Sequence, residues 1–451
     1  MNTIAKDMSE IIKPRTLSGF RDFLPDAMIM REWLIDTTKQ VYRSYGYAPI
    51  DTPALEYFEI LAGKGSEETD RQMYQFRDQG DRHVGMRFDL TVPLARYCAQ
   101  HINELGTPFK RYHIATVWRG EKAQTGRYRE FMQCDFDTIG TTSIQSDIET
   151  GLVIYDLMRA IGFDRFKIRV NNRKVLNGFL DKHGLASASV AVLRAIDKFE
   201  KVGKESVAAE IQKNCGATES QIEQVFALVE KQPDNLSTLE RLKSLISGNE
   251  LGEQGVAELE HLILAMEAVG IREQSLAIDV SIARGLDYYT GTIFETNLLD
   301  LPSIGSVCSG GRYDNLAELF TRQKLPGIGA SLGLDRLLAA METLGMTRSN
   351  RTQALVLIAM FDERYLHDYL RLAAGLRAAG IGTEVYPEPK KVGVQLKYAD
   401  KKGYRFAIIA GEDEFNRNIV QIKHLPTSEQ CEVPFEQNVD SILGQLRVWQ
   451  E

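Results

Sequence analysis

The sequence predicts an α+β protein with an antiparallel sheet flanked by helices, a helical insertion in that core and a small C-terminal α/β domain. Three observations support this architecture. Short strand-like runs joined by charged turns fill much of residues 72–140. Residues 172–272 are rich in Ala, Leu, Glu, Lys and Gln, which favours helices. Beyond residue 354 the hydrophobic pattern follows a βαβαβ order, which is typical of a separate α/β domain.

The length and composition indicate a globular protein of several domains. At 451 residues the chain is too long for one ordinary core, so we expect two or three domains. Hydrophobic residues make up 43% and charged residues 26%, which excludes disordered and collagen-like classes. No uninterrupted apolar run of about 18 residues occurs, and the N-terminus lacks the apolar block of a secretory signal. We therefore expect a cytoplasmic protein without a membrane span.

The cysteine, histidine and charge counts exclude further classes of protein and of site. The five cysteines contain no C-x-x-C pair and the seven histidines no H-E-x-x-H, so we expect neither a disulfide framework nor a dedicated protein metal site. The formal net charge of −8 argues against a protein that coats nucleic acid without sequence preference, although local basic patches can still bind nucleic acid.

The N-terminal part of the core reads as a helix followed by strands. Apolar side chains follow helical spacing up to the natural stop at Gly46: Met30, Trp33, Leu34, Val41 and Tyr45. The segment YAPIDTPALE then reads as an extended strand, and Pro53 suits an edge or interface strand because proline cannot donate to a ladder. Four strand-like segments follow: QMYQFRD, HVGMRFDLTV, RYHIATVWRG and EFMQCDFDTIG.

The second half of the core follows the insertion. Strand signals return at SLAIDVSIARGLDYYTGTIFET and lead to a helix at GLDRLLAAMETLG. Residues 345–353 are polar and form a predicted linker. The C-terminal domain then alternates between strands (ALVLIAM, IGTEVY, RFAIIAG) and helices, the first of which ends at Gly380, in a largely parallel or mixed sheet.

The densest polar cluster is a predicted hairpin at residues 116–137. Arg119 and Glu121 leave the first strand on alternate positions, so their side chains share a face. Alternate side chains of the returning strand also share a face: Phe131, Gln133, Asp135 and Asp137. Cations, an aromatic ring and an amide–carboxylate pair on one concave sheet suit phosphate or carboxylate binding, because arginine offers a planar fork. A solvated hairpin with surface ion pairs explains these residues equally well on their own.

Four other polar positions are ambiguous. Asp89, between apolar neighbours before a helix, is most simply an N-cap. Tyr288 and Tyr289 point to opposite sides of a predicted strand, so one packs in the core and one faces a cleft. Arg284 stands among apolar residues and needs an anionic partner if it is buried.

The glycine-rich run LPGIGASLGLDRLLAAM is a predicted strand-to-helix passage. Gly327 and Gly329 superficially match a dinucleotide fingerprint, but Gly333 is one position too late and no βαβ context supports a Rossmann site. No G-x-x-x-x-G-K-[ST] occurs, which excludes a P-loop. We interpret the run as a strand that feeds a helix whose first turn carries Asp335 and Arg336, where the arginine meets an anion against the sheet.

In chain order these segments resemble the three signature motifs of class II aminoacyl-tRNA synthetases. The motifs are the long helix and strand ending at Pro53, the R-x-E…R-x-x-x-F hairpin at 119–131 and G-x-G-x-x-x-G-L-D-R at 327–336. RGLDYYTGTIFE and SGGRYDNL resemble the two histidine-specific segments of histidyl-tRNA synthetases. The resemblance covers nearly the whole chain, including QLKYADKKG…AIIAGEDE of the family's anticodon-binding domain. It implies a class II synthetase fold and a ligase that activates L-histidine with ATP and transfers it to tRNA(His).

The resemblance also implies domains and site residues. The catalytic core comprises residues 1–171 and 273–345, the helical insertion 172–272 and the anticodon-binding domain 354–451. Arg119 and Arg284 are implied to be catalytic, on opposite sides of the α-phosphate. The implied histidine-binding residues are Asp89, Leu90, Thr91, Arg119, Gln133, Asp137, Arg284, Tyr288 and Tyr289. The implied ATP-binding residues are Arg119, Glu121, Arg127, Phe131 and Arg336.

Cofactor and partners follow from the same resemblance. Mg²⁺ is implied to accompany ATP, with no tightly bound cofactor and no metal on dedicated protein ligands. The implied partners are tRNA(His), ATP, L-histidine and a second copy of the chain, with Trp33 and the strand around Pro53 at a two-fold interface. We expect tRNA to meet the hairpin loop 122–128, the insertion and the C-terminal domain, and we expect no membrane partner.

Two other functions stay open on the sequence. The regulatory subunit of ATP phosphoribosyltransferase, a catalytically silent paralogue, resembles the family's core but usually lacks the C-terminal domain and departs at the histidine segments. A synthetase-like sensor of histidine or uncharged tRNA, fused to a larger protein, is the other, and the self-contained length argues against it.

Overall fold

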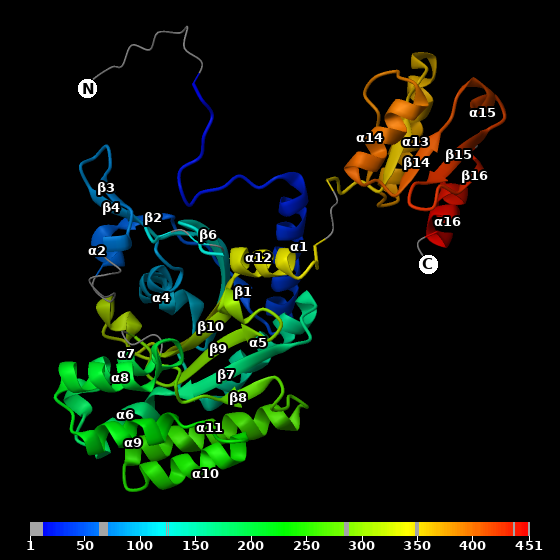
Figure 1. Cartoon of the computed structure of the whole chain (residues 1–451). Helices are drawn as coiled ribbons and strands as arrows, with labels where there is room; N and C mark the ends of the chain where they lie inside the picture. The colour runs from blue at the N-terminus through cyan, green and yellow to red at the C-terminus, as the bar shows by residue number, and fades with distance from the viewer. Residues whose placement is uncertain are drawn as a thin grey trace. The chain divides into compact units, whose positions relative to one another are not determined.

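The structure, a computed structural model, describes residues 12–62, 71–122, 124, 126–283, 288–347, 351–435 and 438–449. The chain divides into two compact units, one made of Met1–Arg21 and Leu34–Gly345, the other of Asp22–Trp33 and Met346–Glu451. Figure 1 labels the helices and strands of both. The first unit contains two sheets and the second unit one.

The first unit is organised around an eight-stranded sheet of order β1-β5-β6-β11-β10-β9-β7-β8. Its strands are β1 (Ala48–Pro49), β5 (Phe109–Trp118), β6 (Glu130–Ile139), β7 (Phe166–Asn172), β8 (Leu276–Ile278), β9 (Thr292–Leu298), β10 (Ser306–Tyr313) and β11 (Gly327–Gly333). Inner neighbours pair antiparallel, as predicted, but β1 with β5 and β7 with β8 pair parallel. The sheet is therefore mixed at both edges, because the long connections within these two pairs let a strand return in the same direction.

A second, three-stranded sheet of order β2-β4-β3 is built from β2 (Leu55–Tyr57), β3 (Gln75–Arg77) and β4 (His83–Met86). The strand predicted at YAPIDTPALE is split into β1 and β2, and Pro53 lies in neither. Proline has no N–H to donate, so a ladder stops there. Helix α2 (Phe58–Leu61) follows β2, and α4 (Thr91–Leu105) follows β4.

Helices α5 (Ile144–Ile161) and α12 (Leu334–Thr343) belong to the first unit, as does helix α1 (Pro25–Ser44) from Leu34 onward. The hydroxyl of fully buried Tyr42 on α1 donates to the carbonyl of Cys134 at 2.8 Å, and its ring centroid lies 5.0 Å from that of Phe136. The even-numbered side chains of β6 thus face α1. Because side chains alternate along a strand, the odd-numbered side chains face the opposite side.

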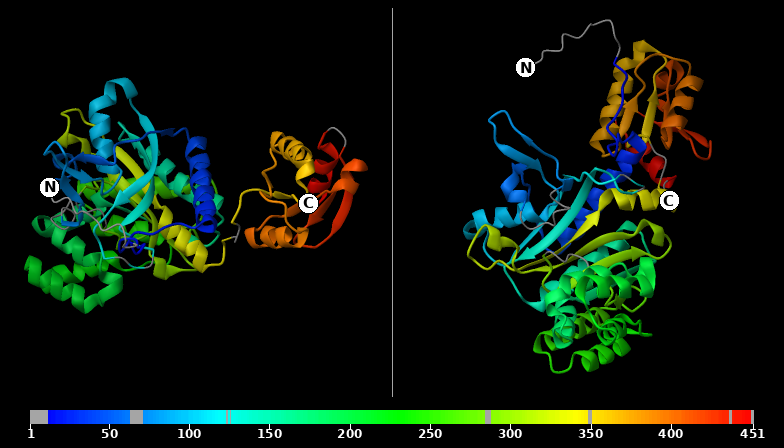
Figure 2. Two further views of the ribbon diagram at one scale, coloured as in Figure 1. Left: turned by 90° about the horizontal axis from the view of Figure 1, so that it is seen from above. Right: turned by 60° about the vertical axis from the view of Figure 1, so that its left-hand side comes forward.

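The chain passes from β7 to β8 through a helical segment, as the composition of this region predicts. Its helices are α6 (Arg173–Lys182), α7 (Ser189–Ile196), α8 (Phe199–Cys215), α9 (Glu219–Val229), α10 (Asn235–Ile246) and α11 (Glu250–Ala268), with a 3-10 turn, η1, at Ala186–Ala188. They form a compact group, drawn in green in Figure 2. Helices α6 and α11 approach at glycines, since a Cβ at Gly178 would lie 2.5 Å from the nitrogen of Gly252.

The second unit contains a five-stranded sheet of order β13-β12-β14-β15-β16. Its strands are β12 (Val356–Ala359), β13 (Thr383–Val385), β14 (Phe406–Ile409), β15 (Ile419–His424) and β16 (Gln430–Pro434), and its helices are α13 (Leu366–Ala378), α14 (Val392–Lys402), α15 (Glu412–Asn416) and α16 (Asp440–Val448). The first three strands in that order are parallel and the rest antiparallel, which makes it a mixed sheet. Leu372 of α13 and Ile442 of α16 pack in one core with Ile358, while Ala399 of α14 packs with Leu357 on the other face.

The two central strands of the large sheet carry glycines where they approach each other. A Cβ at Gly310 of β10 would lie 2.1 Å from the carbonyl oxygen of Gly329 on β11. A Cβ at Gly329 would lie 2.2 Å from Oδ1 of Asp137 on β6. Neither position has room for a larger residue, so the surface above these strands is shaped by side chains from elsewhere.

Across the described parts of the chain, no helix is both long and apolar enough to cross a membrane.

Candidate active site

A cavity of about 340 Å³ opens over the central strands of the first unit. Strands β6, β10 and β11, the first turn of α12, the hairpin after β5 and the segment before β9 all contribute to its wall. The predicted site residues that line it are Thr91, Arg119, Glu121, Arg127, Phe131, Gln133, Asp137, Tyr288, Tyr289 and Arg336. The sheet thus brings together residues from four separate segments of the sequence.

Strand β6 supplies the floor. Phe131, Gln133, Asp135 and Asp137 all line the cavity, as their alternation predicts. Cys134 lies between them and is fully buried on the other face of the strand. The same alternation that hides Cys134 against α1 exposes the polar residues to the cavity.

Arg119 comes directly after β5 and is held in place by its neighbours. Its Nε donates to the carbonyl of Phe88 at 3.0 Å. Its guanidinium carbon lies 4.4 Å from the ring centroid of Phe88 and 5.1 Å from that of Phe131. The charge is therefore oriented before any ligand arrives, which suits it to stabilise an anion in the cavity.

The hairpin beyond Arg119 carries Glu121 and Arg127. Arg127 Nη1 lies 3.8 Å from Glu121 Oε2, and the Arg127 side chain is 52% exposed. The Glu121 carbonyl accepts a hydrogen bond from Arg129 Nε at 2.9 Å, which fixes the base of the hairpin. Arg127 is thus a half-exposed cation on the cavity wall, whereas its neighbours orient Arg119.

Asp335 and Arg336 lie in the first turn of α12 and make different contacts. Asp335 Oδ1 pairs with Arg21 Nη2 at 3.0 Å, and Asp335 Oδ2 accepts from the nitrogen of Met132 at 2.7 Å. This carboxylate therefore ties α12 to β6. Arg336 lines the cavity, and its Nη1 donates to the carbonyl of Ser306. The structure places Arg336 in the first turn of α12, as predicted, and on the wall of the cavity.

The deepest part of the floor is a buried charge cluster around Asp137. Its Oδ1 accepts from the hydroxyl of Tyr313, and its Oδ2 lies 2.6 Å from Nη2 of fully buried Arg111. Burial raises the pKa of Asp137, and the Arg111 charge and the Tyr313 hydrogen bond act in the opposite direction. Oδ1 is thus hydrogen-bonded, while Oδ2 is in ion-pair range of Arg111 but accepts no hydrogen bond within the described residues.

Asp135 and Gln133 likewise each keep an oxygen that accepts no hydrogen bond within the described residues. Gln133 Nε2 donates to Ser331 Oγ at 2.7 Å. Within the described residues, Gln133 Oε1 and Asp135 Oδ1 accept no hydrogen bond. Burial and the nearby Asp137 raise the pKa of Asp135 to about 7, although Arg111 opposes the shift.

The tyrosine pair lies in irregular backbone before β9. Tyr288 and Tyr289 both line the cavity, with ring centroids 4.5 Å apart. The prediction that they lie in a strand is wrong, because β9 begins only at Thr292. Tyr289 nevertheless packs against the hydrophobic cluster around Leu94, whereas Tyr288 is 37% exposed. Burial raises the pKa of Tyr289, so its phenol stays protonated and able to donate. Arg284 lies outside the described residues.

Asp89 acts as a helix cap. Its Oδ1 accepts from the nitrogens of Thr91 and Val92 at 3.0 and 2.9 Å, which satisfies donors at the start of α4. Leu90 is fully buried, and Thr91 reaches the cavity. The negative charge of Asp89 nevertheless raises the pKa of Asp135 and Asp137, so it lies within electrostatic range of the floor.

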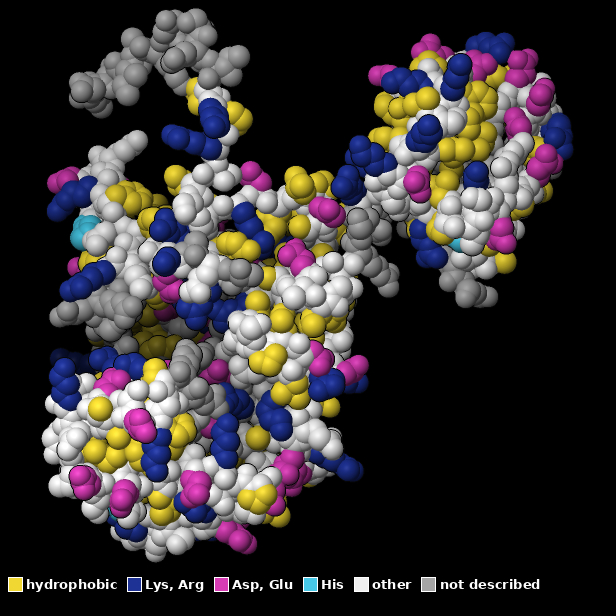
Figure 3. All heavy atoms as spheres, viewed as in Figure 1, with side chains coloured by type: hydrophobic (Ala, Val, Ile, Leu, Met, Phe, Trp, Pro, Cys, Tyr) yellow, Lys and Arg dark blue, Asp and Glu magenta, His cyan; other side chains and the backbone are white. Residues whose placement is uncertain are grey.

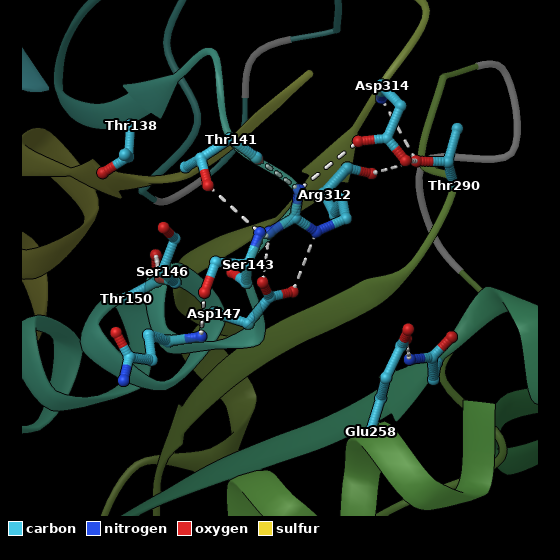
Figure 4. Close-up of polar contacts among 12 residues, drawn as sticks. Thr138, Thr141, Ser143, Ser146, Asp147, Thr150, Glu258, Thr290, Arg312 and Asp314 are labelled. Carbon is cyan, nitrogen blue, oxygen red and sulfur yellow. Dashed lines mark hydrogen bonds and ion pairs between the residues drawn. The ribbon is translucent and has the colours of Figure 1, made fainter. Parts of the chain in front are cut away.

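A second buried cluster is centred on Arg312 and Asp147 (Figure 4). Arg312, at the end of β10, pairs with Asp147 of α5 and donates to the carbonyl of Thr141 at 3.0 Å. The carbonyl of Arg312 accepts from the nitrogen of Thr290 at 2.7 Å, and Thr290 Oγ1 donates to Asp314 Oδ2 at 2.7 Å. Thr290 follows the tyrosines directly, so this cluster fixes the backbone that carries them.

Sequence reasoning missed the residues that support the site from beneath. Tyr313, Ser331 and Asp335 line the cavity, and Arg111 is fully buried against Asp137. Strand register contains a usable signal, since Arg111 pairs opposite Asp137 and Ser331 opposite Asp135. That register is set by turns and loops far from these positions.

Comparison with known proteins identifies the family. A histidyl-tRNA synthetase model matches residues 19–337, and an anticodon-binding-domain model matches residues 353–445. The chain belongs to the histidyl-tRNA synthetase family. It is 59% identical over 425 residues to the histidine–tRNA ligase of Rhodopirellula baltica, which covers 94% of this chain and 96% of that protein. It is 44% identical over 438 residues to the histidine–tRNA ligase of Wolinella succinogenes, with 96% and 99% covered.

Solved structures of histidyl-tRNA synthetases share the fold. The crystal structure from Nostoc sp. PCC 7120 matches with a TM-score of 0.88 and 34% identity, covering 98% of this chain and 100% of that chain. The predicted class II fold and the family resemblance are confirmed. A structure from Bacillus halodurans C, described as an ATP phosphoribosyltransferase regulatory subunit/histidyl-tRNA synthetase, matches with a TM-score of 0.74 at 21% identity over 89% of this chain and 99% of that chain, which shows the fold alone.

Proposed function

We propose that this chain is a histidine–tRNA ligase that converts L-histidine and ATP to histidyl-adenylate and pyrophosphate, then transfers histidine to the 3′ end of tRNA(His). The observation that carries the proposal is one cavity whose wall contains Arg119, Arg127 and Arg336 and whose floor is polar, with amide, carboxylate and phenol groups. Family membership gives the reaction, and this geometry matches its two substrates.

The arginines suit the ATP half of the reaction. The histidine carboxylate attacks the α-phosphorus in line and displaces pyrophosphate, so negative charge accumulates around phosphorus. Arg119 and Arg284 are the proposed catalytic residues on either side of the α-phosphate. Arg336 holds the terminal phosphates, Arg127 folds the triphosphate back, Phe131 stacks on adenine and Glu121 faces the adenine side. No general base is required, because the attacking carboxylate is ionised at neutral pH.

The floor suits the histidine half. Asp89, Leu90 and Thr91 at the start of α4, Gln133 and Asp137 of β6, and the Tyr288–Tyr289 pair form the proposed pocket, with Arg119 and Arg284 toward the carboxylate. A site that hydrogen-bonds both ring nitrogens rejects analogues that lack them far better than an apolar slot does. The buried polar groups of the floor therefore favour an imidazole over an aliphatic or purely aromatic side chain.

Mg²⁺ is the proposed cofactor, carried by ATP. In the described residues no group of three or more His, Cys, Asp or Glu side chains could hold a metal ion. Mg²⁺ commonly takes phosphate oxygens and water with only one or two carboxylates, so an ion carried by ATP needs no dedicated set of protein ligands. The ion would neutralise charge on the triphosphate.

The remaining assignments concern partners and place. We assign tRNA binding to the hairpin loop, the insertion and the C-terminal unit, and residues 354–451 to the anticodon. Acidic and basic side chains are interspersed over the surface of the insertion in Figure 3, so local groups rather than one broad basic field would contact phosphates. Candidate contacts on the C-terminal unit are Lys390, Lys391, Lys397, Lys401 and Lys402.

We also assign the protein to the cytoplasm, where translation consumes its product. We assign it as a homodimer with Trp33 near the interface.

Histidine-dependent ATP–pyrophosphate exchange tests the proposal. We expect exchange with histidine and none with the other amino acids, followed by charging of tRNA(His). A folded protein that binds histidine but supports no exchange would instead indicate the silent regulatory function. Light scattering during gel filtration reports the oligomeric state in the same preparation.

A further inference from the structure

The segment that precedes α1 lies against the hairpin that forms part of the cavity wall. The carbonyl of Gly19 accepts from the nitrogen of Arg129 at 2.9 Å, and the carbonyl of Ser18 accepts from Arg129 Nη1 at 3.2 Å. Gly19 has a φ of 84°, and a Cβ there would lie 2.7 Å from Cγ of Arg129. This position therefore requires a glycine, both for its left-handed backbone and for its close approach to the hairpin.

Two residues later, Arg21 joins the hairpin to helix α12. Its Nη1 donates to the hydroxyl of Tyr128 on the hairpin at 3.0 Å, and its Nη2 donates to Asp335 Oδ1 in the first turn of α12 at 3.0 Å. The guanidinium carbon also lies 4.1 Å from the centroid of the Tyr128 ring. The Arg21 side chain is 24% exposed and that of Asp335 3% exposed, so these contacts are largely shielded from water. One arginine thus bridges two segments that are far apart in the sequence.

Both residues that Arg21 binds are sequence neighbours of an arginine on the cavity wall. Tyr128 follows Arg127, Asp335 precedes Arg336, and all four line the cavity. The hairpin turn also packs against α12, because a Cβ at Gly126 would lie 3.6 Å from Cγ of Arg336. The two arginines of the wall therefore belong to elements that Arg21 ties together.

We propose that Arg21 is a positioning residue that sets the separation of Arg127 and Arg336, and thereby the fit of the site to a triphosphate. This inference rests on the proposed function, in which these two arginines bind the outer phosphates of ATP. Arg21 itself is not among the residues that line the cavity, so it acts through its partners. A guanidinium presents its donors in a rigid fork, and two directed bonds from it fix the distance between their acceptors. A small displacement of either phosphate-binding arginine then costs affinity for the triphosphate.

The test compares Arg21→Ala with wild type in the binding of ATP, with Mg²⁺ present, and of AMP by calorimetry. We expect Arg21→Ala to weaken ATP binding about 10-fold and AMP binding less than about 2-fold, because AMP lacks the phosphates that Arg127 and Arg336 contact. Arg15→Ala, at an exposed arginine of the same segment, is the matched control and should leave both affinities unchanged. Equal weakening of ATP and AMP in the folded variant would show a general loss of the pocket and overturn the inference, as would an unchanged affinity for ATP.

Two smaller changes keep the test decisive if thermal unfolding shows that Arg21→Ala does not fold. Arg21→Lys can keep the pair with Asp335 but not a second directed bond, and Tyr128→Phe removes only the hydroxyl that accepts from Arg21. We expect each change to weaken ATP binding about 3-fold, with little effect on AMP. The combined variant should lose no more than Arg21→Lys alone, because both changes break the same contact. Wild-type affinity in both single variants, or fully additive losses, would overturn the inference.

The two proposals can fail separately. Absence of pyrophosphate exchange in wild type counts against the ligase, and calorimetry with ATP and AMP then tests Arg21 alone. A loss specific to ATP in Arg21→Ala supports the positioning role, whereas a wild-type protein that binds no ATP overturns it.

Discussion

Two buried polar clusters lie on the same sheet, and only one of them is complete without a ligand. Behind the tyrosine segment, Nε, Nη1 and Nη2 of Arg312 all donate, to Asp147, to Asp314 or to backbone carbonyls. On the cavity floor, Gln133 and Asp135 each keep an acceptor that no described residue satisfies. Both regions contain buried charged and polar side chains, so neither residue type nor burial distinguishes a structural cluster from a binding site. The two regions differ in whether each buried acceptor has a hydrogen-bond donor within the protein.

The largest expected effect breaks the complete cluster. Asp147→Ala leaves Arg312 buried without its carboxylate, and breaking such a pair costs about 3–5 kcal/mol. Chemical denaturation measures the loss in the free energy of unfolding. Asp156→Ala, at an exposed position of the same helix, is the control and should change stability by about 0.5 kcal/mol or less. A loss for Asp147→Ala no larger than the control's would show that the cluster does not support the fold.

Removing a cation from the cavity should affect chemistry and leave stability nearly unchanged. Arg119→Ala should slow pyrophosphate exchange about 10²–10³-fold, because a preorganised charge is lost where negative charge develops. Arg284→Ala is expected to act similarly, with little change in histidine affinity. Arg165→Ala, on an exposed arginine that pairs with Asp300, is the control. Near-normal turnover in either variant would remove that arginine from the catalytic role.

The incomplete cluster should respond in substrate affinity. Gln133→Ala removes one unpaired acceptor and the hydrogen bond to Ser331. We expect the histidine KM to rise about 10-fold, with a smaller change in kcat. Steady-state exchange at varied histidine concentration measures this split. An unchanged histidine KM would place Gln133 outside the pocket, and the same criterion applies to Asp137.

The last expected effect concerns pH. Burial raises the pKa of Asp135 from 3.8 to about 7, so the folded protein holds this proton more tightly than the unfolded chain. The folded state therefore binds more protons between about pH 4 and 7, and the contribution of Asp135 to stability falls as pH rises through that window. Asp135→Asn lacks this loss, so its melting temperature relative to wild type should be higher at about pH 8 than at about pH 5. An equal difference at both pH values would contradict the raised pKa.

The sequence predicts the elements of this fold better than their junctions. Period-two alternation is enough to place Gln133, Asp135 and Asp137 on one face of β6. The same rule does not apply to Tyr288 and Tyr289, because alternation holds only inside a strand and β9 starts after them. Proline chemistry explains why the strand around Pro53 is interrupted, but a local pattern cannot tell an edge strand from a break.

The supporting residues of the site depend on long-range register. Arg111 sits in a strand that reads as ordinary amphipathic sequence, and its role follows only from its pairing opposite Asp137. Ser331 likewise becomes meaningful once β11 is aligned with β6. These alignments result from the packing of the whole sheet, which no short stretch encodes.

The glycines of the central strands limit how this cavity can be redesigned. Gly310 and Gly329 have no space for a methyl group, since their Cβ positions coincide with backbone or with Asp137. Libraries randomised at these two positions should return glycine alone among folded clones, whatever amino acid is selected for. A change of substrate specificity would therefore require substitutions in β6 or in the tyrosine segment, because their side chains can be replaced without a backbone clash.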